Sequence, residues 1–191
     1  MSQVRVIGGR LRGRRIQVPH AQGLRPTPDR LRETLFNWLA PALAGSRCID
    51  LFAGTGVLGI EAWSRGAGEV IWIERSRRVA AHLRETLVEL GGPPASQVVC
   101  GDALQWLGPG RAQAGLDPLD ILFLDPPYQH PLLAPAAAAL EAGDWLAEGA
   151  WIYVEQPAGT HPEVPPSWSL YRESRAGSAC ARLYRRCRPS N

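Results

Sequence analysis

Hydrophobic and polar positions follow two periods along most of the chain. From residue 47 onward, short apolar runs alternate with segments whose apolar residues recur every three or four positions. The first pattern predicts buried strands and the second predicts amphipathic helices. The expected strands are 47–52, 69–74, 97–100, 119–125 and 150–156, and the expected helices are 57–66, 76–92, 103–108 and 132–146, the last bent or started late at Pro135. This alternation predicts a mostly parallel sheet with helices on both faces.

Both ends of the chain add to this body. Residues 4–9 and 14–19 read as two short strands around an arginine-rich turn, and "TPDRLRETLFNWLA" reads as a helix with Thr27 as its N-cap and Pro28 at its first position. After the proline-rich loop 156–168, residues 169–174 and 179–187 read as an antiparallel hairpin that brings the sheet to seven strands. We expect an N-terminal extension at 1–40 and the α/β domain at 41–188.

Composition narrows the class of protein without naming a function. The 45% hydrophobic and 20% charged content is that of a soluble globular protein, and neither an export signal nor a membrane-spanning run is visible. The four cysteines form no C-x-x-C pair and the four histidines are scattered, which predicts reduced thiols, no metal site and a cytoplasmic protein.

Charge is concentrated at the N-terminus. Residues 1–32 contain eight arginines and one acid, so this segment carries +7 of a net charge that is +3 for the whole chain. Every basic residue is arginine, whose planar fork suits phosphates and base edges. A solvated face remains the alternative for any single arginine, but the cluster predicts a polyanionic partner. The candidates for contact with it are Arg10, Arg12, Arg14, Arg15, Arg25 and Arg30.

The loop "DLFAGTGVLG" after the first body strand predicts a cofactor site. Gly54, Gly56 and Gly59 spell G-x-G-x-x-G, and Glu74 follows at the end of the next strand. Glycines let backbone approach a ligand closely, and a carboxylate at that strand end binds ribose hydroxyls. These features suit any cofactor that contains adenosine, including NAD.

Two further acids change the choice of cofactor. Asp50, just before the glycines, would repel a pyrophosphate but would suit the ammonium group of S-adenosylmethionine. Asp102 follows the third strand, where an adenine amino group could be read. Each acid alone could be a cap of a loop or helix, but three at successive strand ends favour S-adenosylmethionine. The full set of expected cofactor-binding residues is Asp50, Phe52, Ala53, Gly54, Thr55, Gly56, Gly59, Glu74, Arg75, Asp102 and Ala103.

The strand at 119–125 ends in "DPPY", which predicts a seat for a flat ring that carries an amino group. Ligands of an open parallel sheet lie beyond the carboxyl ends of its strands, so this tetrapeptide should share an edge with the glycine loop. The Asp125 carboxylate and the Pro126 carbonyl can each accept one amine hydrogen, Pro127 stiffens the backbone, and the Tyr128 ring offers a face for stacking. A proline turn after a strand is the alternative for this motif taken alone.

The glycine loop and the DPPY motif together resemble class I S-adenosylmethionine-dependent methyltransferases that act on exocyclic amines of nucleobases. With "RVIGGRLRGRRIQVP", "LRPTPDRLRETLFNWL" and "IYVEQ", the chain is similar from Arg5 to Arg186 to the bacterial 16S rRNA (guanine(966)-N(2))-methyltransferase family. The resemblance implies a Rossmann-like class I fold, methyl transfer from S-adenosylmethionine to a guanine N2, and 16S rRNA of the small ribosomal subunit as partner. It implies no metal.

Three rival functions are weighed against this prediction. An NAD-dependent oxidoreductase would leave the DPPY motif and the arginine cluster without a role. A DNA adenine-N6 methyltransferase would share the chemistry, but the chain is short and shows no separate target-recognition domain. A non-catalytic RNA-binding protein is disfavoured by the intact glycine loop. We expect a monomer, because no additional interface element is visible.

Overall fold

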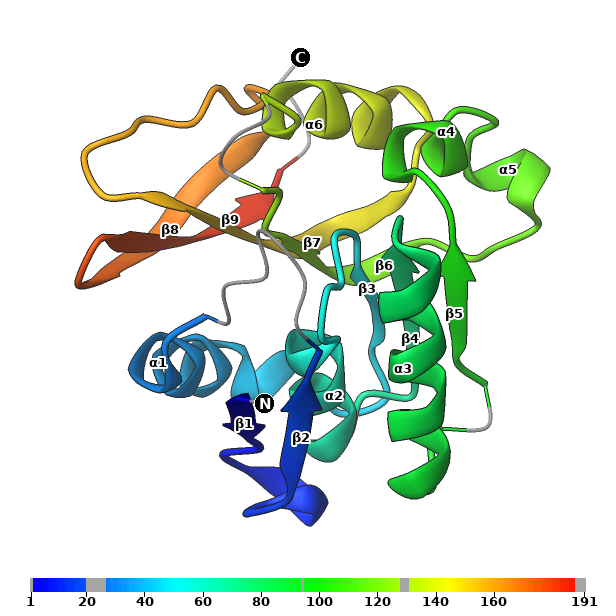
Figure 1. Cartoon of the computed structure of the whole chain (residues 1–191). Helices are drawn as coiled ribbons and strands as arrows, with labels where there is room; N and C mark the ends of the chain where they lie inside the picture. The colour runs from blue at the N-terminus through cyan, green and yellow to red at the C-terminus, as the bar shows by residue number, and fades with distance from the viewer. Residues whose placement is uncertain (1, 20–26, 94, 128–130, 188–191) are drawn as a thin grey trace.

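The computed structural model describes residues 2–19, 27–93, 95–127 and 131–187. Within these residues, a seven-stranded sheet has the order β5-β4-β3-β6-β7-β9-β8 (Figure 1). β3, β4, β5, β6 and β7 are mutually parallel, whereas β9 is antiparallel to both of its neighbours. This arrangement confirms the predicted sheet and its closing hairpin. The strands are β3 (Arg47–Asp50), β4 (Glu69–Glu74), β5 (Gln97–Cys100), β6 (Leu119–Leu124), β7 (Leu146–Pro157), β8 (Trp168–Ala176) and β9 (Ala179–Arg186).

Helices cover the two faces of the sheet in separate layers, as Figure 1 shows. One layer holds α1, α2 and α3, and the other holds α4, α5 and α6. Each face has its own hydrophobic core, with Trp72 and Phe123 in the first and Leu122 and Trp145 in the second. The bounds are α1 (Asp29–Leu39), α2 (Val57–Ser64), α3 (Arg77–Glu89), α4 (Ala103–Leu107), α5 (Arg111–Ala114) and α6 (Leu133–Ala142), with 3₁₀ turns η1 (Gly9–Leu11) and η2 (Ala40–Ala42).

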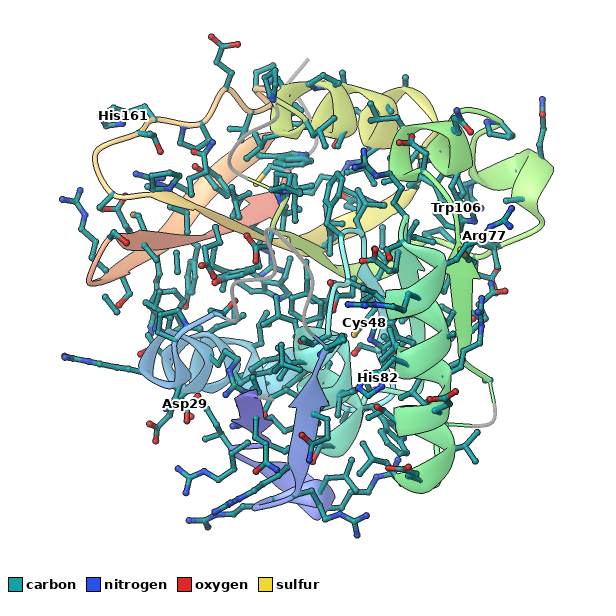
Figure 2. All side chains as sticks on the ribbon, viewed as in Figure 1. Asp29, Cys48, Arg77, His82, Trp106 and His161 are labelled. Carbon is teal, nitrogen blue, oxygen red and sulfur yellow. The ribbon has the colours of Figure 1, made fainter. Side chains whose placement is uncertain are left out.

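The N-terminal strands pair as predicted and pack on the body. β1 (Ser2–Arg5) and β2 (Arg15–Val18) are antiparallel, and their apolar side chains, including Val4 and Ile16, share the first core with α1 and α2. His82 of α3, labelled in Figure 2, donates a hydrogen bond of 2.9 Å to the carbonyl oxygen of Gln17. The hairpin is therefore held by α3 as well as by the core.

The start of α1 differs from the prediction. The N-cap position is occupied by Pro28, not Thr27, and no side chain caps the helix. Asp29 does lie in the first turn, where its carboxylate forms a salt bridge with Arg32. An acid in that turn interacts favourably with the helix dipole, which compensates for the missing cap.

The segments on either side of β6 contain two further corrections. The helix predicted at 132–146 begins at Leu133, with Pro135 inside its first turn, and ends at Ala142; residues from Leu146 belong to β7. Asp144 has a positive φ of 51°, which no helix continues through. Trp145 instead stacks on Trp106, labelled in Figure 2, with ring centroids 4.4 Å apart. The four-residue helix α5 was not predicted.

No helix among the described residues is both long and apolar enough to cross a membrane.

Candidate active site

The glycine loop lies where β3 and β4 end. Its backbone is tied to the neighbouring strand, because Ala53 donates its N–H to the Ile73 carbonyl at 2.9 Å and Gly54 donates to Glu74 Oε2, also at 2.9 Å. Gly54 and Gly56 have φ values of 53° and 73°, in the left-handed region that favours glycine. Two glycines in this region let the chain turn sharply from strand into helix α2.

Two of the three glycines serve the packing of α2 against the sheet. A Cβ on Gly59 would lie 2.2 Å from Trp72 Nε1, and a Cβ on Gly56 would lie 2.4 Å from Leu83 Cδ1. Both distances are too short for real atoms, so the close approach of α2 and α3 to β4 depends on these glycines. Gly54 is half-buried at the surface of the loop. The prediction that a glycine lets backbone approach a ligand therefore applies to Gly54.

Asp50 is a buried carboxylate at the carboxyl end of β3. It is 3% exposed and accepts a hydrogen bond of 3.1 Å from the Gly59 N–H. Burial raises its pKa to about 7, the Gly59 hydrogen bond acts in the opposite direction, and the charge of Glu74 adds to the rise. A buried carboxylate so disfavoured in its charged form is ready to accept a cationic partner.

Glu74 and Asp102 extend this line of acids along the same edge. Glu74 Oε1 accepts the Ser76 N–H at 2.6 Å, and its carbonyl accepts the Gly101 N–H at 3.0 Å. Asp102 Oδ1 caps α4 by accepting from Leu104 and Gln105 at 3.0 and 3.1 Å. The capping role is therefore real for Asp102, while the remaining lone pairs of its carboxylate can still meet a ligand.

The other expected cofactor residues lie around these acids. Phe52 is half-buried, Ala53 and Thr55 are buried, Arg75 is exposed and Ala103 is buried at the start of α4. All of them occupy the loops that follow β3, β4 and β5 or the first residue beyond. The structure thus brings the whole predicted set to one edge of the sheet.

Asp125 follows β6 on this edge and lies next to Asp50. Strand β6 pairs with β3, and the Leu51 N–H bonds the Phe123 carbonyl at 3.1 Å, so the two strand ends are adjacent. Burial, the charge of Glu155 and the charge of Asp50 together raise the pKa of the Asp125 carboxyl well above its usual range. Pro126 is buried and Pro127 is exposed. Tyr128, the fourth residue of the motif, lies outside the described residues.

The Asp125 carboxylate has no side-chain hydrogen bond or ion pair among the described residues, 2–19, 27–93, 95–127 and 131–187. The neighbouring acid Asp50, by contrast, is held by Gly59. An internal partner for Asp125 would have contradicted the predicted seat for an amine.

One site residue was missed in the sequence. Glu155, 4% exposed near the end of β7, accepts a hydrogen bond of 2.7 Å from the hydroxyl of the fully buried Tyr153. The charge of Glu155 reaches Asp125 and raises its pKa. The available signal was the acid in "IYVEQ", two positions from a buried tyrosine on the same face of an otherwise apolar strand.

The arginine-rich turn lies away from the glycine loop. The Leu11 N–H bonds Ser64 Oγ at 2.9 Å, and the guanidinium of Arg10 lies 4.1 Å from the centre of the Trp63 ring, so the turn packs at the C-terminal end of α2. The glycine loop is at the other end of this eight-residue helix, about 12 Å away. Of the predicted contact residues, Arg10, Arg12, Arg14, Arg15 and Arg30 are exposed, and Arg25 lies outside the described residues.

One arginine of the N-terminal cluster is not part of its surface. Arg32 is fully buried; it donates to the Arg5 carbonyl at 3.0 Å and lies 3.7 Å from the carboxylate of Glu61, which is also fully buried. Glu61 further accepts the backbone N–H groups of Ile7 and Gly8 at 2.9 and 2.8 Å. Arg32 of α1 therefore connects the N-terminal hairpin, through the Arg5 carbonyl, with Glu61 of α2. The charge of +7 on residues 1–32 overstates the exposed positive charge of this region.

Strand order and site together define a class I methyltransferase fold: a parallel sheet closed by a reversed hairpin, with a glycine loop and acids at its carboxyl edge. An RNA methyltransferase from Salinibacter ruber, solved with S-adenosyl-L-homocysteine, shares this fold at a TM-score of 0.65, with 14% identity over 87% of this chain and 97% of that one.

Proteins with higher sequence identity show the family to which the chain belongs. A family model described as "Conserved hypothetical protein 95" matches residues 4–185. Ribosomal RNA small subunit methyltransferase D of Escherichia coli K12 is 47% identical over 96% of this chain and 90% of its own, and that of Haemophilus influenzae is 39% identical over 95% and 93%. The solved yhhF structure from Escherichia coli has a TM-score of 0.87 at 42% identity, over 97% of this chain and 99% of that one. The chain belongs to the ribosomal RNA small subunit methyltransferase D family.

Proposed function

We propose that the protein transfers a methyl group from S-adenosylmethionine to the exocyclic N2 amine of a guanine in 16S rRNA of the small ribosomal subunit. The observation that carries this proposal is the adjacency of Asp50 and Asp125 at one sheet edge, the first beside the glycine loop and the second without an internal hydrogen-bond partner among the described residues. The family's relatives are named as methyltransferases of small-subunit ribosomal RNA, which supports the substrate class.

The residues at the edge fit S-adenosylmethionine better than a dinucleotide. Asp50 would face the ammonium group, Glu74 the ribose hydroxyls and Asp102 the adenine amine. A pyrophosphate in the same place would meet the buried carboxylate of Asp50, and like charges at short range are strongly unfavourable. This argument counts against the NAD-dependent oxidoreductase.

The contribution of the protein to the reaction is to orient the amine. S-adenosylmethionine supplies an already activated methyl group, so alignment provides most of the catalysis, with effective molarities of about 10⁵–10⁸ M for well-oriented groups. The Asp125 carboxylate and the Pro126 carbonyl would accept the two amine hydrogens and leave the nitrogen lone pair free for attack. The Asp125 carboxylate also stabilises the positive charge that develops on this nitrogen.

RNA is preferred over DNA because of the relatives' names and the chain's size, and guanine over adenine because of the family resemblance of the sequence motifs. The seat itself accepts an amine of either base, so DNA adenine-N6 methylation remains the rival that the experiment must exclude. We retain three predictions with this proposal: residues 1–40 bind RNA while 41–188 carry the transfer, the enzyme is a monomer, and it acts in the cytoplasm.

The test is methylation of small subunits that lack the modification. Purified protein, labelled S-adenosylmethionine and these subunits should give N2-methylguanosine on nucleoside analysis, and duplex DNA should give no labelled adenine. Asp125→Ala should lower the rate of single-turnover transfer by at least about 10²-fold and leave S-adenosylhomocysteine binding intact. Asp117→Ala, which removes an exposed acid at the surface, is the matched control. Normal turnover by Asp125→Ala would disprove the role of the seat, and labelled N6-methyladenine would favour the rival.

A further inference from the structure

A continuous strip of rings and guanidinium groups lies on the α1 side of the sheet. The guanidinium carbon of Arg172 is 6.0 Å from the centre of the Trp38 ring and 5.0 Å from that of Tyr171. The Tyr171 ring meets Trp151 edge-on with centroids 4.9 Å apart, and Arg185 lies 4.8 Å from the Trp151 ring. We call Trp38, Trp151, Tyr171, Arg172 and Arg185 the ring–guanidinium strip. Its members come from α1, β7, β8 and β9.

An irregularity in β8 builds the middle of the strip. Leu170 pairs with Tyr184 and Arg172 with Leu183, so Tyr171 is an extra residue without a partner in β9. Such a bulge departs from the strict alternation of side chains between the two faces of a strand. Tyr171 and Arg172, which are neighbours in sequence, can therefore both contribute to the same strip.

The strip is positively charged, and its outer part is exposed while Trp38 and Trp151 are half-buried. Tyr171 is 50% exposed, and Arg172 and Arg185 are exposed. The hairpin β8–β9 holds three other arginines, Arg175, Arg182 and Arg186, and each of these is paired with Glu173 or Glu141. Neither Arg172 nor Arg185 has an ion pair in the described part of the chain. The uncompensated charge of the hairpin is thus concentrated on the face that carries the rings.

The strip is on the same face of the sheet as the acids of the active site. Trp151, Tyr153 and Glu155 alternate along β7, so their side chains point to one face. Glu155 influences Asp125, and Trp151 lies four residues before it, about 13 Å along the strand. A polymer that places one base at Asp125 can therefore reach the strip without crossing to the other side of the sheet.

We propose that the ring–guanidinium strip binds unpaired nucleotides of the RNA that carries the target base, with a base stacked on Tyr171 and phosphates held by Arg172 and Arg185. This inference rests on the proposed function for its polymer. Exposed rings next to unpaired guanidinium groups are the combination that single-stranded nucleic acids use, because every base has a flat face and every linkage a negative charge. An apolar protein partner would leave both arginines desolvated without a counter-charge.

The experiment measures RNA affinity separately from methyl transfer. Binding of a single-stranded 16S rRNA fragment containing the target guanine, and of small subunits, is titrated in S-adenosylhomocysteine for wild type, Tyr171→Ala and Tyr171→Phe. Tyr171→Ala should weaken binding of both by roughly five- to 150-fold, whereas Tyr171→Phe, which keeps the ring face, should bind like wild type. Arg172→Ala with Arg185→Ala should reduce the slope of log affinity against log salt by about 2.

Two controls separate the strip from general effects. Val88→Ala removes part of a strongly exposed apolar side chain on α3, and Arg175→Ala removes a paired arginine of the same hairpin; both should bind RNA like wild type. S-adenosylhomocysteine affinity should be the same in every variant.

Each outcome decides one proposal. Unchanged fragment and subunit binding by Tyr171→Ala, with wild type active, overturns the strip and leaves the proposed function standing. Weaker binding to subunits with normal binding to the fragment would assign the strip to a ribosomal protein and also overturn it. Failure of wild type to methylate subunits contradicts the proposed function, while the fragment titration still tests the strip.

Discussion

At the scale of single residues, the site is defined by carboxylates that burial makes reluctant to ionise. Asp50 and Asp125 both have raised pKa values, and burial is the largest cause for each. In an enzyme that must hold a cation and an amine side by side, this is useful. Asp50 accepts one hydrogen bond, from Gly59, and Asp125 accepts none from the side chains of the described residues, so each carboxylate gains from a positive or hydrogen-donating ligand.

The Asp50 pKa leads to a prediction for cofactor binding. Because the pKa is raised to about 7, the carboxyl of the ligand-free protein is mostly protonated below pH 7 and mostly charged above it. An ammonium group binds to the charged form, so S-adenosylhomocysteine affinity should rise with pH, by up to about tenfold per unit below pH 7, and level off above it. Calorimetric titrations about one unit on either side of pH 7 measure this.

Asp50→Asn provides the control for this titration. The amide cannot ionise, so the variant should bind weakly at both pH values and lose the rise. A wild-type affinity that does not change across the same interval would mean that Asp50 does not face the ammonium group.

At the scale of elements, a buried ionic cluster joins the N-terminal hairpin to α1 and α2, in addition to the apolar core and the hydrogen bonds of Ser64 and His82. Glu61 of α2 receives two backbone N–H groups of the arm and the Nε–H of Arg65 at 2.8 Å, and it faces the buried Arg32 of α1. The cluster therefore helps to set the position of the N-terminal hairpin against α1 and α2.

Removing the charge of Glu61 should destabilise the protein. Glu61→Gln leaves Asp29 as the ionic partner of Arg32, but it turns an amide NH2 toward one of the N–H donors that Glu61 accepts, and an unsatisfied buried group costs about 1–3 kcal/mol. Urea unfolding followed by circular dichroism should show this loss, and Glu89→Gln, at an exposed position of α3, should change the free energy of unfolding by less than about 0.5 kcal/mol. If the Glu61→Gln variant is as stable as wild type, the ionic cluster does not contribute to the free energy of unfolding.

The elements also show what the sequence could predict. Strands β4 and β5 match their predicted limits, because short apolar runs bounded by polar residues and glycines leave little choice. The limits of α6 were wrong, since Trp145 and Leu146 lie three and four residues after Ala142 and continue the helical spacing, although the chain leaves the helix before Asp144. Helix α5 is four residues long and too short to show a period.

The site also has features that the sequence could predict and features that it could not. Acids at successive strand ends were predictable, because parallel strands end at one edge whatever their order. Glu155 was not, since its effect on Asp125 depends on β6 and β7 being neighbours, which local pattern does not reveal. Counting charges also could not show that Arg32 is buried, because an arginine looks alike in sequence whether it faces solvent or Glu61.

At the scale of the whole molecule, RNA would contact the protein over a long surface. The arginine-rich turn lies about 12 Å from the glycine loop along α2. An RNA bound at the carboxyl edge of the sheet can reach this turn only if it also extends along the N-terminal hairpin. The turn is thus expected to supply affinity, not orientation of the target base.

Substitution of two arginines in the turn tests this expectation. Arg12→Ala with Arg14→Ala should weaken RNA binding and lower the salt slope by about 2, because each lost phosphate contact lowers it by about 1. The rate of single-turnover transfer at saturating RNA should stay near that of wild type. Arg84→Glu on α3 changes the net charge equally and controls for long-range attraction. An unchanged slope in the double variant would remove the turn from the RNA-binding surface.

The extra residue in β8 also affects how the sheet meets solvent. β8 is an outermost strand, and a regular outer strand offers its free backbone groups as a template for a strand of another molecule. The register break at Tyr171 and the exposed arginines that follow it, Arg172 and Arg175, make β8 a poor template for such pairing. Deleting Tyr171 would restore regular pairing and would therefore risk edge-to-edge aggregation. The bulge thus protects the edge strand β8 from pairing with strands of other molecules.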